Sequence, residues 1–266
     1  MDLTDAKRIV VIGGGQAAAQ AIQSLRMGGY TGELTLVGEE PALPYQRPPL
    51  SKAYMKGEFA EERLYFKPAA WYADNNVELV LSTRATAINR TDRKVELEHG
   101  GHLDYDALII ATGSRPRGLP IEGADLEHVY ALRGLADVER IRPQMVAGRS
   151  ILIVGAGYIG LEAAAVAQQM GLKTTVLEMA PRVLARVTSP VMSEFYETEH
   201  RRQGVDIRTI TSLSKLEGKD GAVTAAVLSD GTRLDADIVL VGIGILPNEE
   251  LAKDAGIACN NGILVN

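Results

Sequence analysis

Two glycine-rich segments contain residue types that can hold the phosphates of a nucleotide. Gly13-Gly14-Gly15 and Gly155-Ala156-Gly157 each follow a short apolar run and precede an alanine-rich stretch. A pyrophosphate gains from the free N–H groups and the dipole of a helix N-terminus only if it comes very close to the backbone. Because side chains would block that approach, a turn of this kind needs glycine.

Three positions of each segment have separate tasks in such a turn. The first permits a tight bend, the second lets the phosphates approach, and the third keeps the following helix close to its strand. In the two segments these positions are Gly13, Gly15 and Ala18, and Gly155, Gly157 and Gly160. A single segment is also compatible with a purely structural turn, but two copies in one chain favour two bound dinucleotides.

An acidic residue ends the apolar run that follows each segment. Glu39 follows Ala18, and Glu178 follows Gly160, at close to the ~20 residues at which a carboxylate binds the adenosine ribose. A carboxylate there repels a 2′-phosphate, so Glu178 favours NADH over NADPH, with Arg182 and Arg186 partly offsetting the repulsion. Since a nicotinamide dehydrogenase needs only one dinucleotide, two sites favour FAD plus NAD(P)H.

The surrounding sequence predicts the elements that position these residues. Each glycine segment lies between two apolar, β-branched runs, 9–12 and 34–37 in the first copy and 151–154 and 174–177 in the second. The intervening alanine-rich stretch has helical character. Strand, turn, helix and strand in this order form the βαβ unit of a parallel sheet.

The repeat continues beyond the βαβ units. Alternating apolar residues and a turn lead to a buried run that ends in glycine in both halves. At one constant offset, Gly100, Leu103, Asp106 and Gly113 correspond to Gly231, Leu234, Asp237 and Gly244. We therefore predict an α/β protein with two Rossmann-like dinucleotide-binding domains, each with a central parallel sheet and a small antiparallel excursion. Residues 1–115 and 247–266 are expected to form an incomplete FAD-binding domain, and residues 116–246 an NADH-binding domain.

Composition excludes several other classes of protein. The chain has 266 residues, a formal net charge of −6 and no apolar run of about 18 residues, so neither nucleic-acid binding nor a membrane span is expected. A single cysteine, Cys259, rules out a disulfide-reducing Cys pair within this sequence, and the four histidines lack metal-ligand spacing. A cytoplasmic protein without a metal is the expectation.

The segment from Pro44 to Lys52 has two interpretations on its composition. Pro48 and Pro49 impose an extended entry, and Ser51 is placed to cap a helix that runs through residues 53–55. The same residues also suit a plain loop with two solvated cations.

Four motifs favour the functional interpretation of this segment. They are Tyr-Gln-Arg-Pro-Pro-Leu-Ser-Lys at 45–52, Gly-Tyr-Ile-Gly-Leu-Glu at 157–162, Pro-Arg-Val-Leu-Ala-Arg-Val-Thr-Ser-Pro at 181–190 and Gly-Ile-Gly-Ile-Leu-Pro-Asn at 242–248. Together they resemble the FAD-dependent reductases that pass electrons from NADH to ferredoxins and rubredoxins. The resemblance covers essentially the whole chain.

The resemblance implies roles for particular residues. The expected FAD site comprises Gly13, Gly15, Ala17, Ala18, Glu39, Arg47, Lys52, Ala85, Thr112, Gly113 and Arg133. The expected NADH site comprises Gly155, Gly157, Ile159, Gly160, Glu178, Arg186, Gly242 and Gly244. Lys52 is expected to pair with Glu162, a residue of the other domain, beside the flavin. Hydride transfer needs alignment and a tuned electrostatic field more than acid–base catalysis, so no nucleophile is expected.

The resemblance also implies a reaction and a partner. Hydride passes from NADH to FAD, and single electrons then pass to an iron–sulfur ferredoxin or a rubredoxin of an oxygenase system. Family members continue into a second FAD segment and a C-terminal domain, so this chain is expected to be truncated before both.

Two other functions remain open. One is a truncated or non-catalytic, redox-sensing NAD(H)-binding protein. The other, a dehydrogenase with one cofactor, is disfavoured by the second glycine segment and by the lack of a Tyr-x-x-x-Lys group. Arg182, Arg186, Arg201 and Arg202 are candidates to face an acidic ferredoxin, although a solvated helix face is the favoured interpretation of the last two.

Overall fold

The computed structural model describes residues 6–265, which form two compact units. The first contains the described residues up to Gln46, together with Glu61–Arg115 and those from Leu246 onward, and the second contains Arg47–Ala60 and Pro116–Ile245. Residues 1–5 and 266 of the expected FAD-binding domain lie outside the described part. Residues 47–60, which the sequence was expected to place in the first domain, belong to the second unit.

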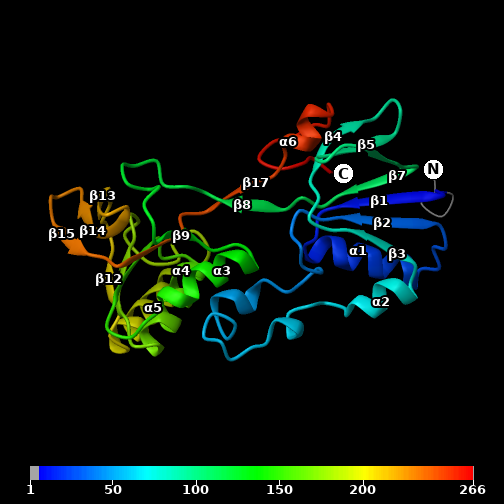
Figure 1. The fold of residues 1–266 in the computed structure, drawn as a ribbon. Helices are drawn as coiled ribbons and strands as arrows, with labels where there is room; N and C mark the ends of the chain where they lie inside the picture. Colours follow the sequence, from blue (N-terminus) through cyan, green and yellow to red (C-terminus); the bar gives the residue numbers. More distant parts are fainter. Residues whose placement is uncertain (1–5, 266) are drawn as a thin grey trace. The chain divides into compact units, whose positions relative to one another are not determined.

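The first unit is built on a parallel sheet with the strand order β3-β2-β1-β7 (Figure 1). Its elements are β1 (Arg8–Ile12), α1 (Gln16–Met27), β2 (Glu33–Val37), η3 (Glu61–Arg63), α2 (Ala69–Asp74), β3 (Val77–Val80), β4 (Ala85–Asn89), β5 (Lys94–Leu97), β6 (His102–Asp104), β7 (Ala107–Ile110) and α6 (Glu250–Asp254). Strands β4, β5 and β6 form a separate antiparallel sheet.

Alternation along β1 explains how this sheet is covered on both faces. Ile9 and Val11 pack with residues of α1 and α2, whereas Val10 and Ile12 pack with residues of β4, β5 and α6. Successive side chains of a strand point to opposite faces, so a run of four apolar residues supplies both cores. All four are at most 4% exposed.

The second unit repeats this plan with a parallel sheet in the order β12-β11-β10-β16-β9. Its elements are η2 (Pro48–Ser51), β9 (Val129–Ala131), α3 (Leu135–Ile141), η4 (Arg142–Gln144), β10 (Ser150–Val154), α4 (Tyr158–Gln169), β11 (Lys173–Leu177), α5 (Pro190–Arg202), β12 (Asp206–Arg208), β13 (Leu213–Lys219), β14 (Ala222–Leu228), β15 (Arg233–Asp235) and β16 (Ile238–Val241). Leu152 and Val154 pack against the antiparallel sheet β13-β14-β15, and α4 packs on β10 and β11. The predicted α/β fold with parallel sheets and antiparallel excursions is confirmed.

The repeat extends to one aspartate in each unit. The Asp106 carboxylate accepts hydrogen bonds from the backbone N–H groups of Lys7 (3.0 Å) and Arg8 (2.9 Å). Asp237 accepts one from Ser150 (2.7 Å), the first residue of β10. The Arg8 side chain also donates to Asp106, which lowers the pKa of that carboxyl. Each aspartate thus joins the start of the central strand to the turn before its neighbour.

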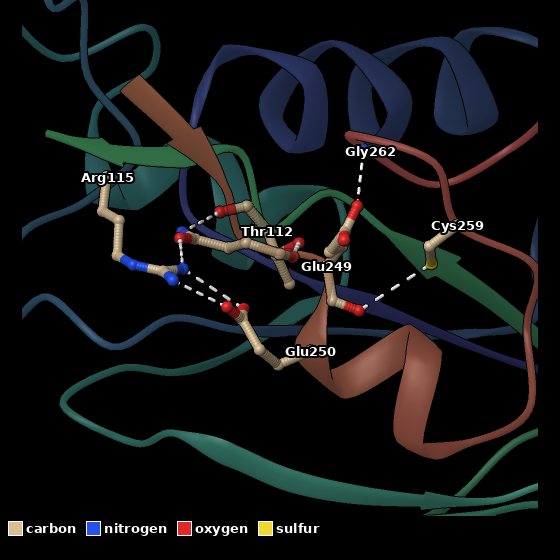
Figure 2. Close-up of polar contacts among 7 residues, drawn as sticks. Thr112, Arg115, Glu249, Glu250, Cys259 and Gly262 are labelled. Atoms are coloured by element: carbon tan, nitrogen blue, oxygen red, sulfur yellow. Dashed lines mark hydrogen bonds and ion pairs between the residues drawn. The ribbon is translucent and has the colours of Figure 1, made fainter. Parts of the chain in front are cut away.

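Two short strands contain points at which the chain passes from one unit to the other. β8 (Ser114–Pro116) and β17 (Ile245–Pro247) pair in a two-stranded sheet. Beyond β17 the chain is fastened to the first unit (Figure 2). Thr112 Oγ1 donates to the Asn248 carbonyl oxygen (2.6 Å), Asn248 Nδ2 donates to the Thr112 carbonyl oxygen (2.9 Å), and Arg115 forms a two-pronged ion pair with Glu250.

Tyr72 of α2 is buried in the first core without a hydrogen-bond partner for its hydroxyl among residues 6–265. Burial raises the pKa of Tyr72 to about 12, because the phenolate would be desolvated. An unpaired buried hydroxyl costs about 1–3 kcal/mol, so Tyr72→Phe is expected to raise the free energy of unfolding by about 1 kcal/mol. Chemical denaturation measures this change.

The matched control for that measurement is Tyr30→Phe in the same core. The Tyr30 hydroxyl donates to the Glu33 carbonyl oxygen (3.0 Å), so its removal is expected to lower stability. Loss of stability in Tyr72→Phe as large as in Tyr30→Phe would show that the Tyr72 hydroxyl is satisfied.

Candidate dinucleotide-binding sites

The glycine turn of the second unit lies between β10 and α4 and cannot accommodate side chains at its closest approaches. Gly155 has a φ of +107°, and a Cβ on it would lie 2.5 Å from the Gly242 carbonyl oxygen. A Cβ on Gly160 would overlap the Gly155 carbonyl oxygen. By contrast, a Cβ on Gly157 would meet nothing within 4 Å, so the space in front of the helix is open on this side.

The first unit has the same turn between β1 and α1. Gly13 has a φ of +119°, and a Cβ on it would overlap the Ala111 carbonyl oxygen. Gly15 faces open space, and Ala18, the third residue of α1, is fully buried in the core against the sheet. The three positions in each turn therefore have the geometry that the sequence analysis assigned to them.

The helices after these turns begin without a side-chain cap. Gly157 precedes α4 and Gly15 precedes α1, and neither helix has an acidic residue in its first turn. In α5, by contrast, the Ser189 side chain accepts a hydrogen bond from the Met192 N–H group. The first N–H groups of a helix need partners, and an uncapped start beside open space suits an anion. The residues of both turns therefore fit a dinucleotide pyrophosphate.

Glu178 has a structural task that its sequence position did not predict. Its carboxylate accepts hydrogen bonds from the backbone N–H groups of Ala156 (2.8 Å) and Ala180 (2.8 Å). It therefore joins the end of β11 to the middle of the glycine turn. An ionised carboxylate has about four acceptor positions, so Glu178 keeps capacity for ribose hydroxyls. Glu39 of the first unit is exposed and directly follows β2 and Gly38.

The structure places the remaining residues of the expected NADH site around the same edge of the second sheet. Ile159 is the second residue of α4 and is 43% exposed. Gly242 follows β16, and its N–H group donates to the Val154 carbonyl oxygen (2.8 Å). Gly244 lies two residues further on, and Arg186 lies exposed in the loop between β11 and α5. In open α/β sheets, ligands bind at the carboxyl ends of parallel strands, which is where these residues gather.

The residues of the expected FAD site fall in both units. The first unit contains Gly13, Gly15, Ala17, Ala18, Glu39, Ala85, Thr112 and Gly113, and the second contains Arg47, Lys52 and Arg133. Ala85 begins β4, and the segment after β7 contains Thr112 and Gly113. The Thr112 hydroxyl donates its proton to Asn248, as described above, which leaves its oxygen as an acceptor. Arg47 donates to the Arg133 carbonyl oxygen (2.7 Å).

Lys52 and Glu162 form the expected ion pair. Lys52 Nζ lies 2.5 Å from Glu162 Oε2, and the side chains are 48% and 32% exposed. Both belong to the second unit, so the expectation that they come from different domains is wrong. The reason is that η2 packs on α4, which brings the Pro-Pro segment to this unit.

Ser51 completes this cluster. It was expected to cap a helix, but its buried hydroxyl donates instead to Glu162 Oε2 (2.6 Å). Only a short 3₁₀ turn, η2, forms here. Lys52 Nζ also donates to the Pro48 carbonyl oxygen (3.2 Å). One carboxylate oxygen therefore holds two consecutive residues of the segment.

The cysteine and the basic residues on α5 lie outside these sites. Cys259 Sγ is placed to donate to the carbonyl oxygens of Ile257 (3.4 Å) and Glu249 (3.9 Å; Figure 2). Desolvation raises the pKa of its thiol. Arg201 pairs with Glu197 (2.9 Å), one helical turn away in α5. Arg202 pairs in the same way with Glu199 (2.7 Å). Exposed pairs of this kind are typical of a solvated helix face.

None of the helices formed by residues 6–265 is long and apolar enough to cross a membrane.

The sequence profile of the pyridine nucleotide-disulphide oxidoreductase family matches residues 7–266. Putidaredoxin reductase from Pseudomonas putida is 44% identical over 97% of this chain and 62% of its own length. Rhodocoxin reductase from Rhodococcus erythropolis is 42% identical over 97% of this chain and 60% of its own length. A rubredoxin-NAD(+) reductase from Pseudomonas putida is 38% identical over 97% and 67%. The chain thus spans about three fifths to two thirds of the length of these relatives.

Solved structures give the same picture. The reductase in a covalent putidaredoxin reductase–putidaredoxin complex matches with a TM-score of 0.94 and 44% identity, over 96% of this chain and 63% of that one. A ferredoxin reductase from Rhodopseudomonas palustris matches with a TM-score of 0.94 and 39% identity, over 97% and 64%. The two glycine turns, the duplicated parallel sheets and these matches lead to one conclusion: the chain belongs to the pyridine nucleotide-disulphide oxidoreductase family.

Proposed function

We propose that this protein is an NADH-dependent ferredoxin or rubredoxin reductase. Hydride passes from NADH to FAD, and electrons then pass singly to an iron–sulfur ferredoxin or a rubredoxin of an oxygenase system. The observation that carries the proposal is the presence of two uncapped glycine turns of the same geometry, one in each unit. The relatives named as reductases of putidaredoxin, rhodocoxin and rubredoxin support this choice of partner.

In this proposal the first unit holds most of the FAD. The Gly13–Gly15 turn receives the pyrophosphate at the start of α1, and Glu39 receives the adenosine ribose. Arg47, Lys52 and Arg133 of the second unit act on the flavin side. Bound FAD accepts two electrons as a hydride and releases them one at a time, which no side chain of the chain can do.

The second unit binds NADH rather than NADPH in this proposal. Glu178 would face a 2′-phosphate with a charge of the same sign. Arg182, which the sequence analysis offered as a partial offset, donates to the carbonyl oxygens of Thr188 and Ala185 and to Ser193. Its guanidinium is therefore committed within the loop, and Arg186 alone of the two arginines remains to face a phosphate.

In this proposal Lys52 and Glu162 help to align the nicotinamide ring with the flavin ring. Hydride transfer depends on the position of two rings and on the charge around them, so a fixed ion pair can set both without exchanging a proton. The Ser51 hydroxyl and the Pro48 carbonyl oxygen restrict where the pair can lie. We place the protein in the cytoplasm, where its one cysteine would stay reduced.

The alternative is a non-catalytic protein that senses the redox state by binding NAD(H). The purified protein, supplied with FAD, distinguishes the two. Under anaerobic conditions the reductase is expected to show flavin absorbance that bleaches on addition of NADH and returns on addition of an oxidised ferredoxin or rubredoxin. Binding of both NADH and flavin without any bleaching of the flavin by NADH would favour the sensor.

Nucleotide choice tests the role of Glu178. NADH is expected to bind about tenfold or more tightly than NADPH, because one like-charge contact opposes the 2′-phosphate. Glu178→Gln keeps the shape of the side chain and is expected to remove most of this preference. Isothermal titration of both nucleotides measures it, with Glu197→Gln on α5 as the control. A preference that survives in Glu178→Gln would exclude this carboxylate as its cause.

Flavin reduction tests the ion pair. Lys52→Met is expected to slow reduction of the flavin by NADH on the order of tenfold, because alignment at the reacting centre is lost. Lys52 is half exposed, so its effect on stability should stay below about 1 kcal/mol. Stopped-flow absorbance measures the rate.

The control for this experiment comes from the same segment. Lys56 pairs with Glu58 (2.8 Å) and lies four residues from Lys52, so Lys56→Met removes an equivalent surface charge. It is expected to leave the rate unchanged. Equal slowing by both substitutions would point to a general electrostatic effect and against the Lys52–Glu162 pair.

A further inference from the structure

The loop between β11 and α5 contains a strained residue that contacts the glycine turn. Leu184 has a φ of +53° and is only 3% exposed. A bulky residue rarely adopts this conformation, which is strained and persists only where its surroundings enforce it. The Leu184 N–H group donates to the Ala156 carbonyl oxygen (2.9 Å). The strain therefore occurs at the point where the loop meets the middle of the Gly155–Gly157 turn.

Ala156 is held from two sides as a result. Its carbonyl oxygen accepts from Leu184, and its N–H group donates to Glu178 Oε2. It is fully buried. The position of the turn thus depends on β11, through Glu178, and on the loop, through Leu184.

Arg182 supplies the contacts that enforce the loop conformation. Its guanidinium donates to the carbonyl oxygens of Thr188 (3.0 Å) and Ala185 (2.9 Å) and to Ser193 Oγ (2.6 Å). Ser193 is 2% exposed, and its hydroxyl donates a hydrogen bond to the Val183 carbonyl oxygen (2.6 Å). Arg182 and Ser193 thereby bind the loop carbonyl oxygens of residues 183, 185 and 188, which lie on both sides of Leu184 in the sequence. A planar fork can reach several acceptors at once, and a lysine ammonium cannot reproduce this geometry.

We propose that Arg182 is a positioning residue of the nucleotide site. Together with Ser193 it holds the strained loop, which supports Ala156 in the glycine turn through Leu184 and contains Arg186 two residues further on. This inference rests on the proposed binding of NADH by the second unit. It replaces both tasks that the sequence suggested for Arg182, a charge facing a phosphate and a charge facing a ferredoxin.

The proposal predicts how substitutions change the loop in the whole 266-residue chain without nucleotide. Arg182→Met is expected to accelerate hydrogen exchange at the N–H groups of Leu184, Val187 and Thr188, which are all bonded inside the loop or to the turn. Exchange within β10 and β11 should not change. Ser193→Ala should accelerate exchange at the same three positions.

The same variants then test the effect on the site. Arg182→Met is expected to weaken NADH binding about tenfold, the loss typical of hydrogen bonds to a charged group. The loss should be the same at low and high salt, because no charge contact with the nucleotide is removed. Arg182→Lys should bind NADH as weakly as Arg182→Met. The double variant with Ser193→Ala should bind no more weakly than Arg182→Met alone, since both substitutions open one network.

Arg201→Met is the control, because Arg201 is a basic residue of the neighbouring helix that pairs only within α5 among the contacts described above. It should change neither exchange nor affinity. Unchanged exchange at Leu184, Val187 and Thr188 in Arg182→Met overturns the inference. The inference is also overturned if Arg182→Lys binds NADH as tightly as the unaltered chain and if that affinity falls strongly with added salt. This result would indicate a direct contact between residue 182 and a phosphate. Failure of the unaltered chain to bind NADH contradicts the proposed function instead, and the exchange result still decides the task of Arg182 in the loop.

Discussion

In both units the helix after the central strand, β1 or β10, can begin where it does because the turn residue has no side chain. A Cβ on Gly13 or on Gly155 would lie less than 3.0 Å from a carbonyl oxygen of the segment after the neighbouring strand. That close approach brings the uncapped ends of α1 and α4 to the carboxyl edge of their sheets. The open space in front of Gly15 and Gly157 follows from the same geometry, so the fold and the anion site depend on one steric constraint.

Carboxylates fix the strands around this constraint. Asp106 and Asp237 hold the starts of β1 and β10 through backbone N–H groups, at equivalent places in the two units. Glu178 acts at the opposite end of the second sheet, where it joins β11 to the glycine turn. Hydrogen bonds between a carboxylate and backbone N–H groups are among the stronger ones in proteins. These contacts therefore fix the start of the central strand in both units and, in the second unit, the carboxyl end of the sheet as well.

Local pattern was enough to predict the repeated elements and the geometry of the two glycine turns. Apolar runs, glycine turns and spacing determine which strands are parallel, and the motif match identified Lys52 and Glu162 as partners. The unit to which residues 47–60 belong could not be predicted, because it depends on the packing of η2 on α4 and not on any periodicity of the segment. The backbone contacts of Glu178, the hydroxyl bond of Ser51 and the engagement of Arg182 were missed for a related reason. Each depends on a side-chain direction that is set by tertiary structure, whereas residue type alone favoured a ribose ligand, a helix cap and a free cation.

The internal hydrogen bonds of the second unit have a consequence for how it would bind its nucleotide. Under the proposed function NADH enters and NAD⁺ leaves in every turnover, so any cost of ordering the site would recur each time. Ordering a loop at the moment of binding costs free energy and weakens affinity. Here the acid, the turn and the loop are already joined through Ala156, with Arg182 and Ser193 closing the loop behind it. A site preorganised in this way can use the binding energy of the nucleotide to align the nicotinamide, which is what hydride transfer requires.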